Sequence, residues 1–144
     1  SAVLELEFPH SDALIMSAAV ADAKVANYSE AKIRKESLNR VDLAKNPDIL
    51  KSLSTNKKLN QIIIGFAAET SEDLAMLEEN GRAKLASKSL DLIYVNNVTN
   101  GAVFGSNFTQ GLIIDRDMNV IKVPEISKDT LSDILLDQLV SKLG

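Results

Sequence analysis

Hydrophobic residues gather in three short, unbroken runs along the chain. The runs cover residues 13–16 (Ala-Leu-Ile-Met), 62–64 (Ile-Ile-Ile) and 92–95 (Leu-Ile-Tyr-Val), each with a polar residue before it and small or polar residues after it. Strands of a parallel sheet are covered on both faces, so they read as continuous apolar runs rather than as alternating apolar and polar positions. The pattern therefore predicts three buried parallel strands.

A helix is predicted between the second and third strands. Residues 71–87 are rich in Glu, Leu, Ala and Lys, and Leu74, Leu77 and Leu85 give them a partial helical stripe. Neighbouring parallel strands need a crossover connection, which is usually a helix. Residues 62–95 are thus predicted to form a strand–helix–strand unit.

The sequence marks the starts of two further helices. Asn46 offers a capping side chain directly before Pro47, and proline suits the first helical position because its missing N–H would have no partner there. Ser127 can cap a final helix that Gly144 ends. Residues 2–8 read as the end of a helix as well. The apolar face of the final helix consists of Leu131, Ile134, Leu135 and Leu139.

The remaining segments predict structure at the periphery. Residues 38–44 alternate apolar and polar side chains, as a half-exposed strand does. Residues 111–115 and 120–123 flank a polar turn and predict an antiparallel hairpin at a sheet edge. Residues 23–39 have little apolar content, so we expect them to form an exposed flap. The basic residues of the flap are Lys24, Lys32, Arg34 and Lys35.

Together these elements predict an α/β fold of three layers. It is Rossmann-like, with a mostly parallel sheet and an antiparallel edge hairpin. Doubly wound sheets usually begin with a strand and a glycine-rich turn, whereas here the first clear strand follows Pro9 and His10. We therefore expect a single domain over residues 1–144 that is truncated at its N-terminus and lacks the first strand, turn and helix.

Composition narrows the classes of function. Hydrophobic residues make up 45% and charged residues 25% of the chain, as in folded globular proteins, and the absence of cysteine excludes disulfides, zinc–thiolate sites and a thiol nucleophile. A net charge of -4 disfavours nucleic acid as a partner. The first residues include Glu5 and Glu7, whereas a signal peptide begins with a basic segment, so the sequence predicts no signal peptide here. No apolar run is long enough to span a bilayer. We expect a cytoplasmic protein that does not bind membranes.

Candidate ligand-binding residues follow the predicted strands. In open parallel sheets, ligands bind beyond the carboxyl ends of the strands. Asp22 can accept a hydrogen bond from an amino group, and Phe66 offers a stacking face for a base. Lys84 and Lys88 lie one helical turn apart and could bind phosphates together with the flap. The loops after the strands are residues 17–22, 65–70 and 96–99, and they predict a nucleotide pocket.

Six short motifs in register extend this prediction. They are Ala18-Ala19-Val20-Ala21-Asp22, Lys32-Ile33-Arg34-Lys35, Asn46-Pro47-Asp48-Ile49-Leu50, Gly65-Phe66-Ala67-Ala68-Glu69-Thr70, Leu90-Asp91-Leu92-Ile93 with Asn96-Asn97, and Phe104-Gly105-Ser106-Asn107. Their order and spacing resemble bacterial phosphopantothenoylcysteine synthetase, the synthetase part of the DNA/pantothenate metabolism flavoprotein family. The resemblance covers roughly residues 11–115.

The resemblance implies a two-step ligase reaction in coenzyme A biosynthesis. The carboxylate of 4'-phosphopantothenate attacks the α-phosphate of CTP, and the amine of L-cysteine then displaces CMP from the acyl-cytidylate. The resemblance also implies Mg²⁺ and a homodimer with the flap near the second subunit. The sequence identifies no metal ligands. We expect this chain to lack the flavin-dependent decarboxylase domain that is often fused ahead of the synthetase, and therefore expect no FMN on it.

The resemblance also implies roles for individual residues. Asp22 would recognise the cytosine, and Lys32 would act catalytically by binding the nucleotide phosphate and the acyl intermediate. The family usually has lysine where Arg34 stands and an aromatic residue where Ala23 stands, so this chain departs from the family at both positions. The implied site comprises Met16, Ser17, Ala18, Asp22, Lys32, Pro47, Asp48, Ile49, Leu50, Phe66, Lys84 and Lys88.

Each of these residues also has a purely structural interpretation. Asn46 and Pro47 can simply start a helix, and Asp48 can stabilise its dipole rather than bind Mg²⁺. Phe66 can belong to the core, and the lysines can be solvated. His10 is the only histidine and is interpreted as structural, since it has no partner for a catalytic dyad or a metal site.

Two other functions compete with the ligase. The chain could be an inactive fragment that binds CTP and dimerises, which the missing first strand favours. An NAD-linked oxidoreductase of the doubly wound type is disfavoured because the glycine-rich dinucleotide fingerprint is missing. The residues alone do not decide between CTP and ATP.

Overall fold

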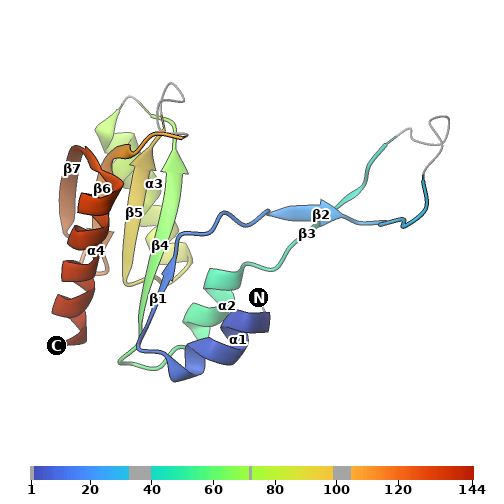
Figure 1. Ribbon diagram of the computed structural model, residues 1–144, viewed down its shortest axis with the longest axis horizontal. Coiled ribbons are helices and arrows are strands. Elements are labelled where there is room, and N and C mark those ends of the chain that lie inside the picture. Colours follow the sequence, from blue (N-terminus) through green and yellow to red (C-terminus); the bar gives the residue numbers. More distant parts are fainter. Residues whose placement is uncertain (1, 33–39, 72, 99–104) are drawn as a thin grey trace.

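A computed structural model describes residues 2–32, 40–71, 73–98 and 105–144 (Figure 1). In chain order the elements are helix α1 (Ala2–Glu7), the 3-10 helix η1 (Phe8–His10), strands β1 (Ala13–Met16), β2 (Ala23–Val25) and β3 (Leu43–Lys45), helix α2 (Ile49–Thr55), strand β4 (Ile62–Glu69), helix α3 (Leu74–Ser87), strands β5 (Leu92–Asn97), β6 (Phe108–Asp115) and β7 (Val120–Ser127), and helix α4 (Lys128–Leu143).

The main sheet has five strands in the order β1-β4-β5-β6-β7. The three apolar runs form β1, β4 and β5, which are parallel to one another, and β6 and β7 form the predicted hairpin. Strands β4 and β5 are largely buried, as predicted, but the prediction of a buried strand was wrong for β1, an edge strand in which only Met16 is buried and Ile15 is exposed. The sheet is mixed rather than mostly parallel, because the β5–β6 and β6–β7 pairs are both antiparallel. The hairpin joins the sheet through β6, without a crossover helix.

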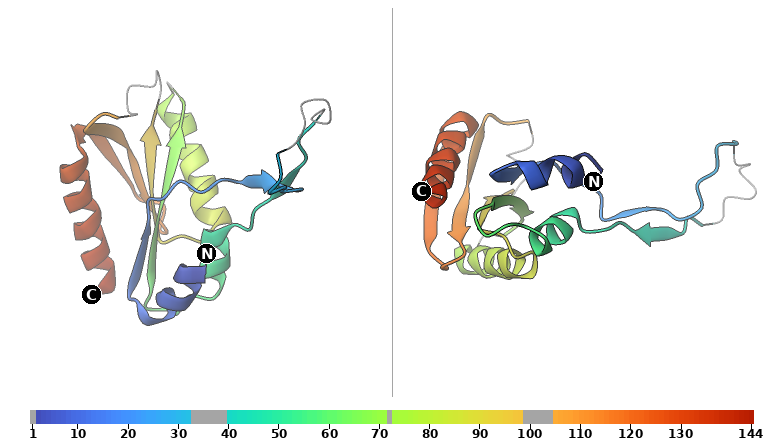
Figure 2. Two further views of the ribbon diagram at one scale, coloured as in Figure 1. Left: turned by 45° about the vertical axis from the view of Figure 1, so that its right-hand side comes forward. Right: turned by 90° about the horizontal axis from the view of Figure 1, so that it is seen from below.

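Helices cover both faces of this sheet, as the three-layer prediction requires (Figures 1 and 2). Successive side chains of a strand point to opposite faces, so Ile63 of β4 packs with α2 and α3, whereas Ile64 packs with α4. Both side chains are completely buried. Burial of one such side chain stabilises the fold by about 1.5–3 kcal/mol.

The predicted helix starts were partly correct. The hydroxyl of Ser127 caps α4 by accepting a hydrogen bond from the Thr130 amide at 3.0 Å, as expected. The start of α2 was predicted wrongly: the cap is Asp48, not Asn46, and the helix begins at Ile49 rather than Pro47. Among the described helices, none has the length and apolar content needed to traverse a lipid bilayer.

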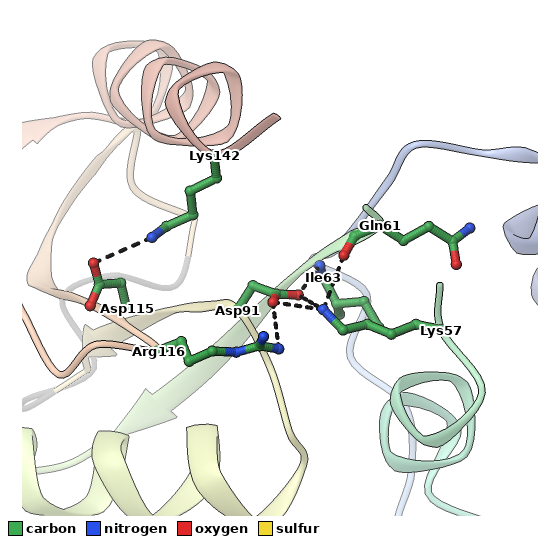
Figure 3. Close-up of polar contacts among 7 residues, drawn as sticks. All are labelled: Lys57, Gln61, Ile63, Asp91, Asp115, Arg116 and Lys142. Carbon is green, nitrogen blue, oxygen red and sulfur yellow. Dashed lines mark hydrogen bonds and ion pairs between the residues drawn. The ribbon is translucent and has the colours of Figure 1, made fainter. Parts of the chain in front are cut away.

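A buried carboxylate fastens the amino ends of β4 and β5 (Figure 3). Asp91 directly precedes β5 and accepts hydrogen bonds from Lys57 at 2.6 Å and from the Ile63 amide at 2.8 Å. Arg116, in the β6–β7 turn, forms an ion pair with the same carboxylate at 2.6 Å. Asp91 thereby joins three separate segments at the end of the sheet opposite to the carboxyl ends of its parallel strands.

Strands β2 and β3 form a separate antiparallel pair that reaches away from the main sheet (Figures 1 and 2). We call residues 23–32 and 40–45 the arm. Every described residue of the predicted flap, from 23 to 32, is exposed. The strand predicted at residues 38–44 was only partly correct: residues 43 and 44 belong to β3 (Leu43–Lys45), residues 40–42 are not in a strand, and residues 38 and 39 lie outside the described part of the chain.

Candidate functional site

A cavity of about 680 Å³ opens at the carboxyl ends of β1 and β4. Four segments form its wall: the loop after β1, the stretch from the end of β3 into α2, the end of β4, and the C-terminal part of α3. Its volume is within the range of about 300–1,000 Å³ typical of small-molecule sites. The cavity therefore lies where the parallel-strand rule placed a ligand.

Most of the residues proposed from the sequence line this cavity. They are Met16, Ala18, Asp22, Pro47, Asp48, Ile49, Leu50, Phe66, Lys84 and Lys88. Ser17 instead lines a second cavity of about 490 Å³ beside α4, which shares the Phe66 end of β4 with the first. Lys32 is exposed on the arm and lines neither cavity. The remaining motif residues Ile33, Arg34, Lys35, Thr99 and Phe104 lie outside the described residues.

The two lysines of α3 are held at the cavity by carboxylates. Lys84 forms an ion pair with Glu69 at 2.5 Å, and Lys88 forms one with Asp48 at 3.4 Å. Their spacing of four residues places them on one helix face, as expected from the sequence. Both lysine side chains are more than a third exposed, and ion pairs of this kind contribute only about 0–1 kcal/mol. An incoming phosphate can exchange with either carboxylate.

Asp48 is occupied by the protein itself. Its carboxylate accepts a hydrogen bond from the Lys51 amide at 3.1 Å and so caps α2. Burial alone would raise the pKa of Asp48, but the Lys51 amide and the positive charge of Lys88 outweigh it, and the pKa lies below its ordinary value. Asp48 is therefore ionised at neutral pH.

Asp22 differs from Asp48 in having no such partner. With the residues that the structure describes, its carboxylate forms neither a hydrogen bond nor an ion pair. An ionised carboxylate is an acceptor only, so the free group can take a hydrogen bond from an amino group of a ligand. This end of the cavity is suited to a ring that carries a hydrogen-bond donor such as an amino group.

Two cavity lysines were missed by sequence reasoning, and the contact of a third cavity residue, Asn46, was not foreseen although its motif was identified. Lys45 and Lys51 line the cavity, and neither side chain forms an ion pair with any residue in the described ranges. Asn46 lies between them in the wall and donates a hydrogen bond to the carbonyl oxygen of Ala21 at 2.9 Å. Neither lysine belongs to a motif or a periodic pattern that distinguishes it from a solvated lysine, and the Asn46 contact joins residues 25 positions apart and so leaves no local signal.

Phe66 separates the two cavities. It is only partly buried, and its ring meets that of Tyr94 edge-on, with 6.0 Å between the ring centroids and 72° between the planes. The Tyr94 hydroxyl is hydrogen-bonded to that of Thr109 at 2.7 Å, and burial raises the pKa of Tyr94. This packing places the ring of Phe66 on the α4 side of the sheet, where the second cavity lies.

The described residues contain no cluster of acidic or histidine side chains suited to a metal ion. Among them, no group of three or more His, Asp or Glu side chains converges in a way that could hold a metal ion. Mg²⁺ can still enter such a cavity as part of its ligand, because it is commonly bound through substrate phosphates and its own waters.

Comparison with known proteins assigns the whole chain to one group. The DNA/pantothenate metabolism flavoprotein C-terminal domain matches residues 1–143. The coenzyme A biosynthesis bifunctional protein CoaBC of Borreliella burgdorferi is 37% identical over 125 residues, which cover 85% of this chain and 30% of that protein. The CoaBC protein of Bacillus subtilis is 38% identical over 133 residues, 91% of this chain and 32% of that protein.

A solved structure shares the fold. The C-terminal domain of the coenzyme A biosynthesis bifunctional protein CoaBC superimposes with a TM-score of 0.71 at 26% identity, covering 96% of this chain and 58% of that domain's chain. The present chain spans about a third of the length of the curated relatives that it matches.

Proposed function

The chain belongs to the DNA/pantothenate metabolism flavoprotein C-terminal domain family, the phosphopantothenoylcysteine synthetase part of CoaBC, and from this premise we propose that it is a CTP-dependent ligase. The ligase joins 4'-phosphopantothenate to L-cysteine in coenzyme A biosynthesis. The observation that carries the proposal is the polarity of the cavity, which has a free carboxylate in one wall and four lysines in the others.

The free carboxylate suits cytosine. The exocyclic amino group of cytosine donates hydrogen bonds, and Asp22 is the cavity carboxylate that the described residues leave without a partner. Phe66 lines the same cavity and the second one beside it. Together these residues support the binding of the base and leave the lysines for the phosphates.

The lysines suit a triphosphate. Lys45 and Lys51 form no ion pair with a described residue, although the charge of Lys51 acts on Asp48 nearby. Lys84 and Lys88 can exchange their weak ion pairs for phosphate contacts. Positive charges fixed before the reaction stabilise the negative charge that develops on the phosphates as pyrophosphate leaves. The nucleotide enters as its Mg²⁺ complex, with the metal carried by the substrate.

The reaction then proceeds in two balanced steps. A carboxylate oxygen of 4'-phosphopantothenate forms a bond to the α-phosphorus of CTP, the bond to the β-phosphate breaks, and pyrophosphate leaves. The cysteine nitrogen next bonds to the acyl carbon, CMP leaves with the bonding electron pair, and the nitrogen loses a proton. The role of the cavity is to hold the reacting groups in line.

Lys32 would act in the cavity of a second copy of the chain. It lies on the exposed arm and outside the cavity, and the arm carries exposed apolar side chains, among them Val25, Tyr28 and Leu43. Burial of such side chains between two arms favours a homodimer. In the dimer, Lys32 would approach the phosphates and the acyl intermediate.

The second candidate is a fragment that binds CTP and dimerises without catalysis. The chain spans about a third of its curated relatives, so parts of their activity can depend on segments beyond this match. This candidate shares the cavity and differs from the first only in chemistry.

One experiment separates the two candidates. The chain is mixed with CTP, Mg²⁺ and 4'-phosphopantothenate, and release of pyrophosphate is followed before and after L-cysteine is added. The ligase releases pyrophosphate in the first stage and CMP in the second. Saturable CTP binding without pyrophosphate supports the fragment, and absence of CTP binding contradicts both.

A further inference from the structure

We propose that Asn46 is a positioning residue that orients the carboxylate of Asp22 and thereby sets the preference for cytidine over uridine nucleotides. The inference rests on the proposed function, since it assigns specificity within the same cavity. It goes further because it attributes that specificity to a residue that bonds only backbone carbonyl groups, those of Ala21 and Asp22.

Asn46 holds both peptide groups that flank the α-carbon of Asp22. Its side-chain amide donates to the carbonyl oxygen of Ala21 at 2.9 Å, and its backbone N–H donates to the carbonyl oxygen of Asp22 at 2.8 Å. The first carbonyl belongs to the peptide before Asp22 and the second to the peptide after it. Because peptide groups are planar, fixing both restricts the two backbone dihedrals of Asp22 and so the direction of its Cα–Cβ bond.

Asn46 is itself held in place on both sides. Pro47 follows it and confines its backbone to the extended region, which keeps it outside the helix. Lys45 precedes it and pairs with Ala23 in the β2–β3 ladder. The donor groups of Asn46 are therefore arranged before any ligand arrives.

Helix capping does not account for this asparagine. The cap of α2 is Asp48, and the Asn46 side chain reaches back to the loop after β1 instead. Aspartate has nearly the same shape as asparagine, but it could not replace Asn46. Its carboxylate would place an acceptor oxygen against the Ala21 carbonyl oxygen, which is also an acceptor. The amide function, rather than the size of the side chain, is what the position uses.

The orientation of Asp22 matters because nothing else aims its carboxylate. No described residue contacts that carboxylate by a hydrogen bond or an ion pair, so its direction follows from its backbone. Cytosine presents an amino donor where uracil presents a carbonyl acceptor, and a carboxylate binds the first and repels the second. A site that requires a donor discriminates strongly against a ligand that lacks it.

The test compares the dissociation constants of CTP and UTP, measured by calorimetry on the intact chain. The variants are Asn46→Ala, Asn46→Asp and the control Asn56→Ala. Asn56 also donates its side-chain amide to a backbone carbonyl, that of Ser52 at 3.2 Å, but it lies at the far end of α2 and outside the cavity. Thermal unfolding of each variant monitors folding.

The proposal predicts a selective loss. Asn46→Ala and Asn46→Asp should reduce the ratio of the UTP to the CTP dissociation constant by about fivefold or more, the effect of one hydrogen bond, while Asn56→Ala leaves it unchanged. If both Asn46 variants fold and weaken CTP and UTP equally, or leave both unchanged, Asn46 does not position Asp22 and the inference is overturned. If the unaltered chain binds neither nucleotide, the proposed function itself fails.

Discussion

Lys88 of α3 faces Asp48 at the start of α2, with 3.4 Å between the lysine nitrogen and a carboxylate oxygen. Both residues line the cavity, so the ion pair holds the ammonium group of Lys88 at the cavity wall. Because both side chains are more than a third exposed, the pair itself contributes little to folding. We therefore expect Lys88 to act in ligand binding rather than in folding.

Replacing Lys88 should therefore separate binding from stability. We expect Lys88→Ala to raise the dissociation constant of CTP about tenfold, the size of one charge-assisted contact, and to change the free energy of unfolding by less than about 1 kcal/mol. Calorimetry and urea unfolding measure the two quantities. Lys122→Ala is the matched control, because Lys122 is an exposed lysine of β7 that lies outside the cavity.

Lys51 offers a test of the phosphate end. Its backbone N–H donates the hydrogen bond by which Asp48 caps α2. Its side chain lines the cavity and forms no ion pair with a described residue. Lys51→Ala should weaken CTP severalfold and leave cytidine, which has no phosphates, unaffected. If the affinities for CTP and cytidine fell equally, the prediction that Lys51 contacts the phosphates would be wrong.

The Asp91 cluster should govern stability rather than binding. Asp91→Asn leaves Lys57 buried without its counter-charge, since only 11% of the lysine side chain is exposed. Loss of one partner of a buried pair costs about 3–5 kcal/mol, which urea unfolding would detect. Asp117→Asn, in the exposed turn before β7, should be nearly neutral. A small effect of Asp91→Asn would contradict the fastening role shown in Figure 3.

Asp115 should make stability depend on pH. Burial alone would raise its pKa, but hydrogen bonds from Asn119 and Lys142 outweigh it and place the pKa below the ordinary value of 3.8. The unfolded chain therefore takes up the proton first as the pH falls. The contribution of Asp115 is complete above the unfolded pKa and is lost as the pH falls through the folded pKa.

Urea unfolding between neutral and strongly acidic pH checks this prediction. The difference in unfolding free energy between the unaltered chain and Asp115→Asn should be constant at neutral pH and shrink in acid. A difference that grows as the pH falls would have the opposite sign and refute the assignment.

The sequence was informative where the structure is local or uniformly buried. The apolar runs gave the parallel strands, and the Ser127 cap was found because a cap acts over three residues. The start of α2 was mispredicted because the Asn46 amide is engaged by Ala21, far away in sequence. The antiparallel edge hairpin was predicted, but the sheet is not mostly parallel, because the antiparallel pairing of β6 with β5 depends on tertiary contacts that no local pattern records.

The candidate site was likewise predictable where it depends on local sequence and not where it depends on distant contacts. The residues after β1 and β4 converge because parallel strands end at one edge, so Asp22 and Phe66 were expected to meet. Lys32 was assigned by resemblance alone, and its place on the arm leaves its role as a prediction that depends on a second copy. Lys45 and Lys51 had no periodic or motif signal to distinguish them from solvated lysines.

The central claim is that this cavity binds CTP, and nuclear magnetic resonance tests it most directly. CTP with Mg²⁺ would be titrated into the ¹⁵N-labelled chain while backbone amide shifts are followed. We predict saturable shifts for residues 18–22, 45–51 and 66–68. No shifts at millimolar CTP, or shifts confined to the second cavity beside α4, would contradict the account.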